Sequence, residues 1–258
     1  MKIAIIGAGL IGTSVALAAE RAWSDLTLTS LDRSDALGAA VGADVIVLAT
    51  PVNIILDIVR HEASRFGPSL IIDTGSTKRA IVKAAREAAL ANFVGGHPMA
   101  GAASTGPGAA RPDLFDGRPW FLVHADPSSP AAKQAQAFVH ALGATPVMFS
   151  DDGAEHDAVM AAVSHLPQVV ATALMKVVGD ATPDGGLHWS GNGLRDTTRL
   201  AASAASVWES VLVQNKAELR PLILKLADTL RQTADRLEDP GAIQDLFAAA
   251  NRYRKMLD

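Results

Sequence analysis

The chain has 258 residues, with 23 Lys or Arg against 27 Asp or Glu, and this balance leaves no basic surface for a nucleic acid. It contains no cysteine, which excludes disulfides, zinc–thiolate sites and a thiol nucleophile. Because no apolar run approaches about 18 residues and no export signal precedes the first strand, we expect a cytoplasmic protein that contacts no membrane and acts on a small molecule.

The first 150 residues alternate short β-branched runs with alanine-rich, amphipathic stretches. Strands are expected at residues 2–6, 26–31, 44–49, 69–72, 93–95, 120–124 and 145–149, and helices at residues 10–22, 54–66, 78–90 and 131–142. The dozen residues between the second and third strands leave room for only a turn or two. This alternation predicts an α/β fold over residues 1–150, with a Rossmann-type, doubly wound and mostly parallel sheet that binds a dinucleotide.

Beyond residue 150 the strand signals stop and helical patterns follow. Helices are expected at residues 154–178, 192–202, 206–236 and 242–257, with a kink at Pro221. We therefore predict an all-helical substrate and dimerisation domain at residues 151–258. Several helices are apolar on more than one face, which favours a homodimer that shares them. The alternative is that the high alanine content exaggerates the apparent burial.

The loop after the first strand carries a glycine spacing typical of dinucleotide binding. Gly7 suits a tight turn, Gly9 lets a pyrophosphate approach the backbone, and Gly12 lets the helix pack against the strand. The cofactor site is expected to include the loop residues between these glycines and the residues that end the third strand. These are Leu10, Ile11, Thr50 and Pro51.

Asp32 lies 20 residues after Gly12, at the end of the second predicted strand. A carboxylate there accepts hydrogen bonds from a ribose diol and repels a 2′-phosphate, which favours NAD. Arg33 could instead pair with the phosphate of NADP, so NADP is not excluded. The other interpretation of Asp32 is a turn acceptor ahead of residues 34–35.

Five further motifs follow in order along the chain. They are Asp-Thr-Gly-Ser-Thr-Lys at 73–78, Gly-Gly-His-Pro-Met-Ala-Gly at 95–101, Ser-His-Leu-Pro-Gln at 164–168, Gly-Leu-Arg-Asp-Thr-Thr-Arg-Leu-Ala at 193–201, and the segment 208–215. Together with the glycine loop, their order resembles the prephenate and arogenate dehydrogenases of tyrosine biosynthesis. The resemblance covers nearly the whole chain.

The resemblance implies oxidative decarboxylation of a cyclohexadienol ring, in which a hydride passes to the nicotinamide, carbon dioxide leaves and the ring becomes aromatic. His97 is the matching catalytic position, and a neutral imidazole suits the removal of the hydroxyl proton without a metal. Ser76 would hydrogen-bond this imidazole or the reacting hydroxyl close to the nicotinamide, so we assign it to both the catalytic and the cofactor sites. The alternative for Ser76 is a helix N-cap.

Three more residues carry the implied substrate contacts. Arg199 matches an arginine that holds a substrate carboxylate, the alternative being an ion pair with Asp196 or Glu209. The ring of His165 would face the substrate side chain, unless it is a satisfied histidine at a helix crossing. Trp208 would close the pocket wall, although packing alone could explain a tryptophan.

The chain departs from the family pattern in two places. Ala102 and Ala103 occupy positions where many members carry Thr-Glu, so an acidic contact is missing. The sequence ends at residue 258, and we expect no regulatory domain. The motifs do not choose between prephenate and arogenate, which differ in one keto or amino group. The rival functions are a β-hydroxyacid dehydrogenase or imine reductase of similar architecture, and a nucleotide sensor without turnover.

Overall fold

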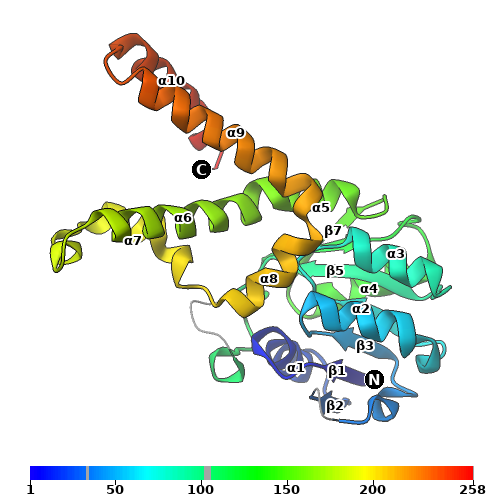
Figure 1. Ribbon diagram of the computed structural model, residues 1–258. Helices are drawn as coiled ribbons and strands as arrows, with labels where there is room; N and C mark the ends of the chain where they lie inside the picture. The colour runs from blue at the N-terminus through cyan, green and yellow to red at the C-terminus, as the bar shows by residue number, and fades with distance from the viewer. Residues whose placement is uncertain (33–34, 102–105, 258) are drawn as a thin grey trace.

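The computed structural model describes residues 1–32, 35–101 and 106–257. Its N-terminal part is a seven-stranded sheet in the order β2-β1-β3-β4-β5-β6-β7 (Figure 1). The strands are β1 (Lys2–Ile6), β2 (Thr27–Leu31), β3 (Val45–Leu48), β4 (Leu70–Asp73), β5 (Phe93–Pro98), β6 (Pro119–Val123) and β7 (Thr145–Phe149). All neighbours are parallel except β5 and β6. The predicted Rossmann-type, mostly parallel sheet is confirmed.

Helices cover both faces of this sheet because the strand residues alternate between two hydrophobic cores. Ile3 and Ile5 pack on one face with helices α1 (Leu10–Ala22) and α4 (Pro130–Ala141). Ala4 and Ile6 pack on the other face with α2 (Val52–His61) and α3 (Arg79–Glu87). The short interval between β2 and β3 holds a single 3-10 turn at Leu37–Ala40, as its length predicted.

The C-terminal part is helical. Its longer elements are α5 (Ala154–Met160), a π-helical turn (Ala161–His165), α6 (Leu166–Ala181), α7 (Asn192–Thr198), α8 (Ala205–Gln214), α9 (Lys216–Asp235) and α10 (Pro240–Arg254). A 3-10 turn at Arg199–Ala202 follows α7. Figure 1 shows two arms that diverge from the α/β part, one made of α6 and α7 and the other of α9 and α10. The arms do not close into a separate globular core.

Two details of these helices differ from the sequence prediction. The helix expected over residues 206–236 is two helices, α8 and α9, and the break lies at Asn215, while α9 continues through Pro221. The Asn215 side chain at this break is buried and donates hydrogen bonds to Asp157 O and His165 Nδ1. The helix expected over residues 154–178 is interrupted by the π-helical turn that ends at His165, and α6 then begins with Pro167 in its first turn. Such turns are rare and occur often at functional sites.

One helical stretch of the described chain, Ala154–Ala181, is long and apolar enough to cross a membrane by length and composition alone. Within it, His156, Asp157 and His165 are buried against the rest of the protein. Large apolar side chains are exposed on both arms and on the π-helical turn before α6, among them Val163, Val177, Trp189, Leu224, Leu230 and Phe247. The apolar character of this stretch therefore belongs to a wider exposed surface of the C-terminal helices.

Candidate active site

The glycine loop lies at the carboxyl end of β1, next to β3, where the strand order reverses direction. The φ of Gly7 is 115°, a value that side chains rarely allow, and its N–H donates to Leu31 O over 2.8 Å. A Cβ on Gly12 would collide with the Gly7 carbonyl oxygen, so α1 can approach β1 only with glycine at this position. A Cβ on Gly9, in contrast, would meet no atom within 4 Å. The space beside Gly9 is therefore open.

That open space faces the start of α1. Gly9 is the N-cap of α1 and provides no side-chain hydrogen bond, which leaves the N–H groups of the first turn, at Leu10 and Ile11, available to an anion. Thr50 adds a second indication, because its Oγ1 is buried without a hydrogen-bond partner, and its Cγ2 lies 3.0 Å from where a Cβ of Gly7 would stand. Pro51 follows as the N-cap of α2. These residues fit the pyrophosphate of a dinucleotide.

Asp32 follows the last residue of β2, whose carbonyl group is bonded to Gly7. Its side chain is exposed beside the glycine loop, and its backbone N–H donates to the Asp35 carboxylate over 2.7 Å. The turn at this point thus uses the Asp35 side chain as acceptor. Arg33, the residue that could favour NADP, lies outside the described residues.

His97 stands near the carboxyl end of β5, on the same edge of the sheet as Thr50 and Ser76. This arrangement follows from the parallel pairing of β1, β3, β4 and β5. Only 8% of the His97 surface is exposed. Its Nε2 forms no hydrogen bond with a described residue and is not fully buried. This nitrogen is therefore accessible to solvent or to a ligand.

The other ring nitrogen of His97 begins a chain of buried hydrogen bonds. His97 Nδ1 lies 3.0 Å from His156 Nε2, and His156 Nδ1 lies 2.9 Å from Asp157 Oδ1. Both partners come from the first turn of α5, and His156 also packs edge-to-face against Phe121 and Phe149. His97 is thus connected to a buried carboxylate through a second imidazole.

Asp157 also caps α3. Its carboxylate accepts the N–H groups of Lys78 at 2.7 Å and Arg79 at 3.0 Å, which are the first donors of that helix. The N-cap role considered for Ser76 is wrong, because α3 begins at Arg79 and Ser76 provides no cap. Ser76 is half-buried, and no hydrogen bond joins it to His97, whose Nδ1 is bonded to His156 instead.

A buried ion pair lies beneath this turn. Lys78 Nζ contacts the Asp73 carboxylate and donates to Gly96 O over 2.7 Å, and neither side chain is exposed. The same carboxylate accepts the N–H groups of Gly75 at 2.8 Å and Gly96 at 3.0 Å. The pair therefore joins the turn that carries Ser76 to the strand that carries His97.

His165 is fully buried and joins the network through Asn215. Asn215 Nδ2 donates to the Asp157 carbonyl oxygen over 2.7 Å and lies 3.0 Å from His165 Nδ1. Because a carbonyl oxygen only accepts, the Asn215 atom at this point is its nitrogen, and His165 Nδ1 must accept as well. The remaining proton of the neutral ring is then on Nε2, which is buried and has no partner among the described residues. Trp208 packs edge-to-face on this ring at 5.9 Å.

Arg199 occupies the 3-10 turn that ends the α6–α7 arm. Gln168 Nε2 donates to Leu200 O over 2.8 Å, so this turn is attached to α6 close to His165. Arg199 is exposed and forms no ion pair with Asp196, Glu209 or any other described residue. The ion-pair interpretation is therefore wrong, and the guanidinium group is available. The structure records no direct contact between Arg199 and His97.

The histidines of the site are neutral near pH 7. Burial lowers the pKa of His97 well below its usual value, and repulsion from the neighbouring histidines and Lys78 adds to this. Burial also lowers the pKa of His165, to about 4. Burial opposes ionisation of Asp157, but hydrogen bonds from His156 and two backbone N–H groups hold the pKa of this carboxyl below its usual value. The site therefore combines neutral imidazoles with an ionised carboxylate.

Comparison with known proteins identifies the family. Residues 10–148 match the nucleotide-binding domain of prephenate dehydrogenase, and residues 152–249 match its dimerization domain. The chain belongs to the prephenate dehydrogenase family. The resemblance deduced from the motifs is confirmed.

Individual proteins show the same relationship. A prephenate dehydrogenase of Lactococcus lactis is 30% identical, over 100% of this chain and 77% of its own length. A cyclohexadienyl dehydrogenase of Zymomonas mobilis is 30% identical, over 99% and 95% of the two chains. The crystal structure of prephenate dehydrogenase from A. aeolicus, in complex with hydroxyphenyl propionate and NAD+, superposes with a TM-score of 0.89 at 21% identity and covers 100% of this chain and 98% of that one.

Sequence reasoning missed several residues of this site. His156, Asp157 and Asn215 were given no role, although the pair His-Asp in the first turn of a helix directly after the last strand could have indicated a cap or a relay. The sequence analysis includes Lys78 and Asp73 only as the two ends of the motif at 73–78 and does not predict their ion pair. A lysine and an aspartate on the two sides of a Gly-Ser turn in an otherwise apolar α/β unit are the signal of a buried pair.

The buried histidines predict a loss of stability in mild acid. An unfolded histidine has a pKa near 6.5, whereas His165 has a pKa of about 4 in the folded protein. Below pH 6.5 the unfolded state therefore binds more protons, and stability falls until the pH reaches the folded pKa. We expect His165 alone to lower the free energy of unfolding by about 2 kcal/mol between pH 7.5 and pH 5.

Urea denaturation of the wild type and of His165→Asn at the two pH values measures this effect. The difference between pH 7.5 and pH 5 should shrink in the variant, while His61→Gln, a change on an exposed histidine of α2, should leave it unchanged. An equal pH dependence in wild type and His165→Asn would contradict the prediction.

Proposed function

We propose that this protein catalyses the NAD-dependent oxidative decarboxylation of prephenate, arogenate or both. The observation that carries the proposal is His97, a neutral imidazole whose Nε2 is accessible at the sheet edge that also carries the glycine loop. Relatives named prephenate dehydrogenase and cyclohexadienyl dehydrogenase, at 30% identity, support the substrate class. Rival dehydrogenases generally use a lysine on the helical domain, and Lys176 lies on the exposed surface of α6, paired with Asp180.

The residues of the site can each be given a task. A bound nicotinamide would supply the acceptor for the hydride of the carbinol carbon. His97 Nε2 takes the hydroxyl proton as the hydride leaves and the carbonyl forms. The electrons of the breaking carbon–carboxylate bond then enter the ring as carbon dioxide leaves, the ring becomes aromatic, and the carbonyl oxygen becomes a phenolate that takes the proton back from His97. Ser76 is half-buried, its hydroxyl forms no hydrogen bond with a described residue, and it would hydrogen-bond the reacting oxygen. No metal is required for these steps, because aromatisation provides the driving force.

We assign the substrate contacts to the helical part. His165 offers a buried Nε2–H donor without a partner, which suits an oxygen of the substrate side chain. Trp208, which packs on that ring, would form the wall beside it. Arg199, whose guanidinium group forms no ion pair with a described residue, would hold a substrate carboxylate.

The cofactor contacts are assigned to the loop Gly7 to Gly12, to Thr50 and Pro51, and to Asp32. The exposed Asp32 carboxylate beside the glycine loop favours the ribose diol of NAD over the 2′-phosphate of NADP. The A. aeolicus relative described with NAD+ supports this preference.

The direct test is the initial rate of nicotinamide reduction, followed by absorbance, with prephenate and arogenate each combined with NAD and NADP. We expect turnover of at least one acid, and faster turnover with NAD than with NADP. The four rates rank the two substrates and the two cofactors. No turnover in any combination, with NAD binding confirmed by calorimetry, would leave the nucleotide sensor or another dehydrogenase as the better function.

The role of Arg199 leads to a separate prediction. Arg199→Gln should raise the KM for the substrate by on the order of 30-fold or more, because a desolvated carboxylate loses a partner worth about 2–5 kcal/mol, while kcat changes less. The matched control is Arg195→Gln, which removes an exposed arginine one turn earlier on α7. Steady-state kinetics of both variants measure this effect. An unchanged KM in Arg199→Gln would show that Arg199 does not bind the substrate.

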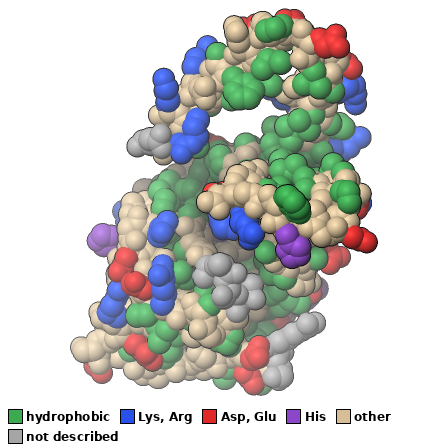
Figure 2. Space-filling view, turned by 90° about the vertical axis from the view of Figure 1, so that its left-hand side faces the viewer, with side chains coloured by type: hydrophobic (Ala, Val, Ile, Leu, Met, Phe, Trp, Pro, Cys, Tyr) green, Lys and Arg blue, Asp and Glu red, His purple; other side chains and the backbone are tan. Residues whose placement is uncertain are grey.

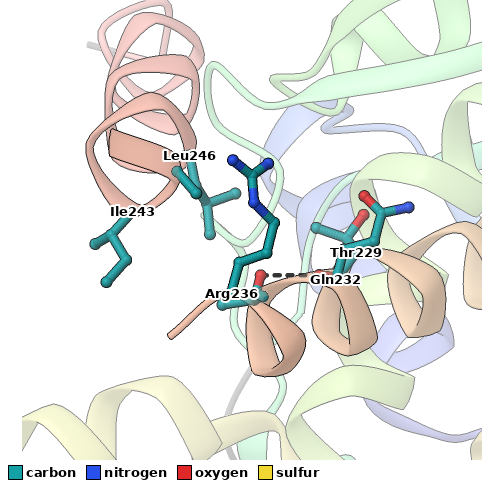
Figure 3. A pocket seen from close by; sticks show the side chains of 7 residues that line it. Thr229, Gln232, Arg236, Ile243 and Leu246 are labelled. Carbon is teal, nitrogen blue, oxygen red and sulfur yellow. Dashed lines mark hydrogen bonds between the residues drawn. The ribbon is translucent and has the colours of Figure 1, made fainter. Parts of the chain in front are cut away.

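We also propose a cytoplasmic homodimer built by the C-terminal helices. Exposed apolar side chains line both arms, and Figure 2 shows them gathered over the projecting helices. Between α9 and α10 lies a hollow of about 120 Å³, and Arg236, Ile243 and Leu246 are among the residues that line it (Figure 3). An apolar surface of this extent on two diverging arms suits a second copy of the chain. The match to a dimerization domain supports this arrangement.

A further inference from the structure

His156 is buried, belongs to no motif singled out in the sequence, and touches neither the glycine loop nor Arg199. Its two nitrogens connect His97 Nδ1, at 3.0 Å, with Asp157 Oδ1, at 2.9 Å. A histidine that merely filled space between Phe121 and Phe149 would need no such pair of hydrogen bonds. These two hydrogen bonds indicate that His156 affects the chemistry of His97.

The proton positions along this chain follow from its buried end. Asp157 accepts N–H groups from the backbone of Lys78 and Arg79, and such contacts favour an ionised carboxylate that only accepts. His156 Nδ1 must then carry a proton and donate it to Asp157. In the neutral ring, His156 Nε2 is consequently bare, and the only hydrogen bond it can form with His97 is as the acceptor of an Nδ1–H.

We propose that His156 is a positioning residue that, together with Asp157, holds neutral His97 as the Nδ1–H tautomer and so leaves its Nε2 free to accept the substrate proton. The Nε2–H form of His97 cannot accept a proton at that atom. His156 does not contact the reacting atoms. It acts through His97 by fixing the tautomer and the orientation of the ring.

Apart from His156, no described group near His97 favours this tautomer. Ser76 forms no hydrogen bond with it, Phe121 meets it only edge-to-face, and no other described side chain reaches its Nδ1. Backbone contacts of His97 belong to the β5–β6 ladder. Without His156, the Nδ1–H group of His97 would have no hydrogen-bond acceptor among the described side chains.

The tautomer can be observed directly by NMR, without any substrate. Protein labelled with ¹⁵N-histidine gives long-range proton–nitrogen correlations that distinguish a protonated ring nitrogen from a bare one. The chain has seven histidines, and His97→Asn identifies the signals of His97. In the wild type at pH 8 we expect a protonated Nδ1 and a bare Nε2 on His97. A protonated Nε2 would overturn the proposal. The tautomer is read from the wild type, and His97→Asn is used only to assign its signals.

Two substitutions of His156 then test the consequence. His156→Leu removes the acceptor, and we expect His97 to shift toward the Nε2–H tautomer and kcat to fall on the order of 100-fold, with KM and NAD affinity nearly unchanged. His156→Gln can place an amide oxygen near His97 Nδ1, and it should recover the Nδ1–H tautomer and most of kcat. The control His61→Gln should change neither the tautomer of His97 nor kcat.

The kinetic part rests on the proposed function, whereas the tautomer measurement does not. If neither acid is turned over but wild-type His97 carries its proton on Nδ1 and loses it in His156→Leu, the proposed substrate class fails and the positioning role stands. If turnover is found but His156→Leu keeps both the tautomer and kcat, the positioning role fails and the function stands. Loss of kcat with an unchanged tautomer also overturns it, because the effect would then be structural.

Discussion

Replacing His97 with Asn is expected to lower kcat by on the order of 100-fold or more, with a modest change in KM. The asparagine amide can still donate to His156 Nε2 from the place of Nδ1, so the buried network keeps its hydrogen bond. The side chain has no counterpart of Nε2, however, and the substrate proton then has no acceptor. Because the glycine loop is untouched, NAD affinity should remain that of the wild type.

The measurement is steady-state reduction of NAD with saturating prephenate, together with calorimetric titration of NAD. His61→Gln is the matched control, since it changes an exposed histidine at the end of α2 and should leave both values unaltered. Turnover of His97→Asn within about threefold of the wild type would remove His97 as the base, since general bases contribute on the order of 100-fold or more. Binding of NAD should be measured first, because lost binding would point to misfolding.

The residues of the site that could be predicted are those whose role depends on their neighbours in the sequence. Gly7, Gly9 and Gly12 follow a strand and open a helix, and the reason for each glycine lies within a few residues of it. The α/β alternation likewise follows from runs of five or six residues, which is why the strands lie close to their predicted positions. His97 could be predicted because it stands in a motif at the end of a strand.

The part that could not be predicted depends on contacts between distant elements. Asp157 caps a helix 78 residues earlier in the chain, and Asn215 bonds to Asp157 and His165 across two helix ends. Periodicity describes which face of a helix is apolar, but it does not reveal which polar side chain finds a partner elsewhere. The helix break at Asn215 was therefore missed and a kink was expected at Pro221, the residue with the stronger local signal.

The Lys78–Asp73 pair shows how stability and site geometry depend on the same contacts. Both side chains are fully buried, and between them they bond to Gly75 and to both backbone groups of Gly96. Burial lowers the pKa of Lys78, and the Asp73 carboxylate opposes this by favouring the ammonium form. A Cβ on Gly96 would collide with the Asp73 backbone oxygen, so the strand passes very close to the turn. The two buried charges therefore compensate each other at the place where His97 and Ser76 are attached to the sheet.

Replacing Lys78 with Met is accordingly expected to lower the free energy of unfolding by about 3–5 kcal/mol, because the Asp73 carboxylate would remain buried without its cation. Adding Asp73→Asn to Lys78→Met should recover part of this loss, since the amide carries no charge and can still accept the N–H groups of Gly75 or Gly96. Lys83→Met breaks a matched but exposed pair with Glu87, 3.8 Å apart, and should change stability by less than about 1 kcal/mol. Urea denaturation at pH 7.5 and one protein concentration compares the three variants with the wild type. A loss in Lys78→Met no larger than in Lys83→Met would show that the buried pair does not stabilise this edge of the sheet.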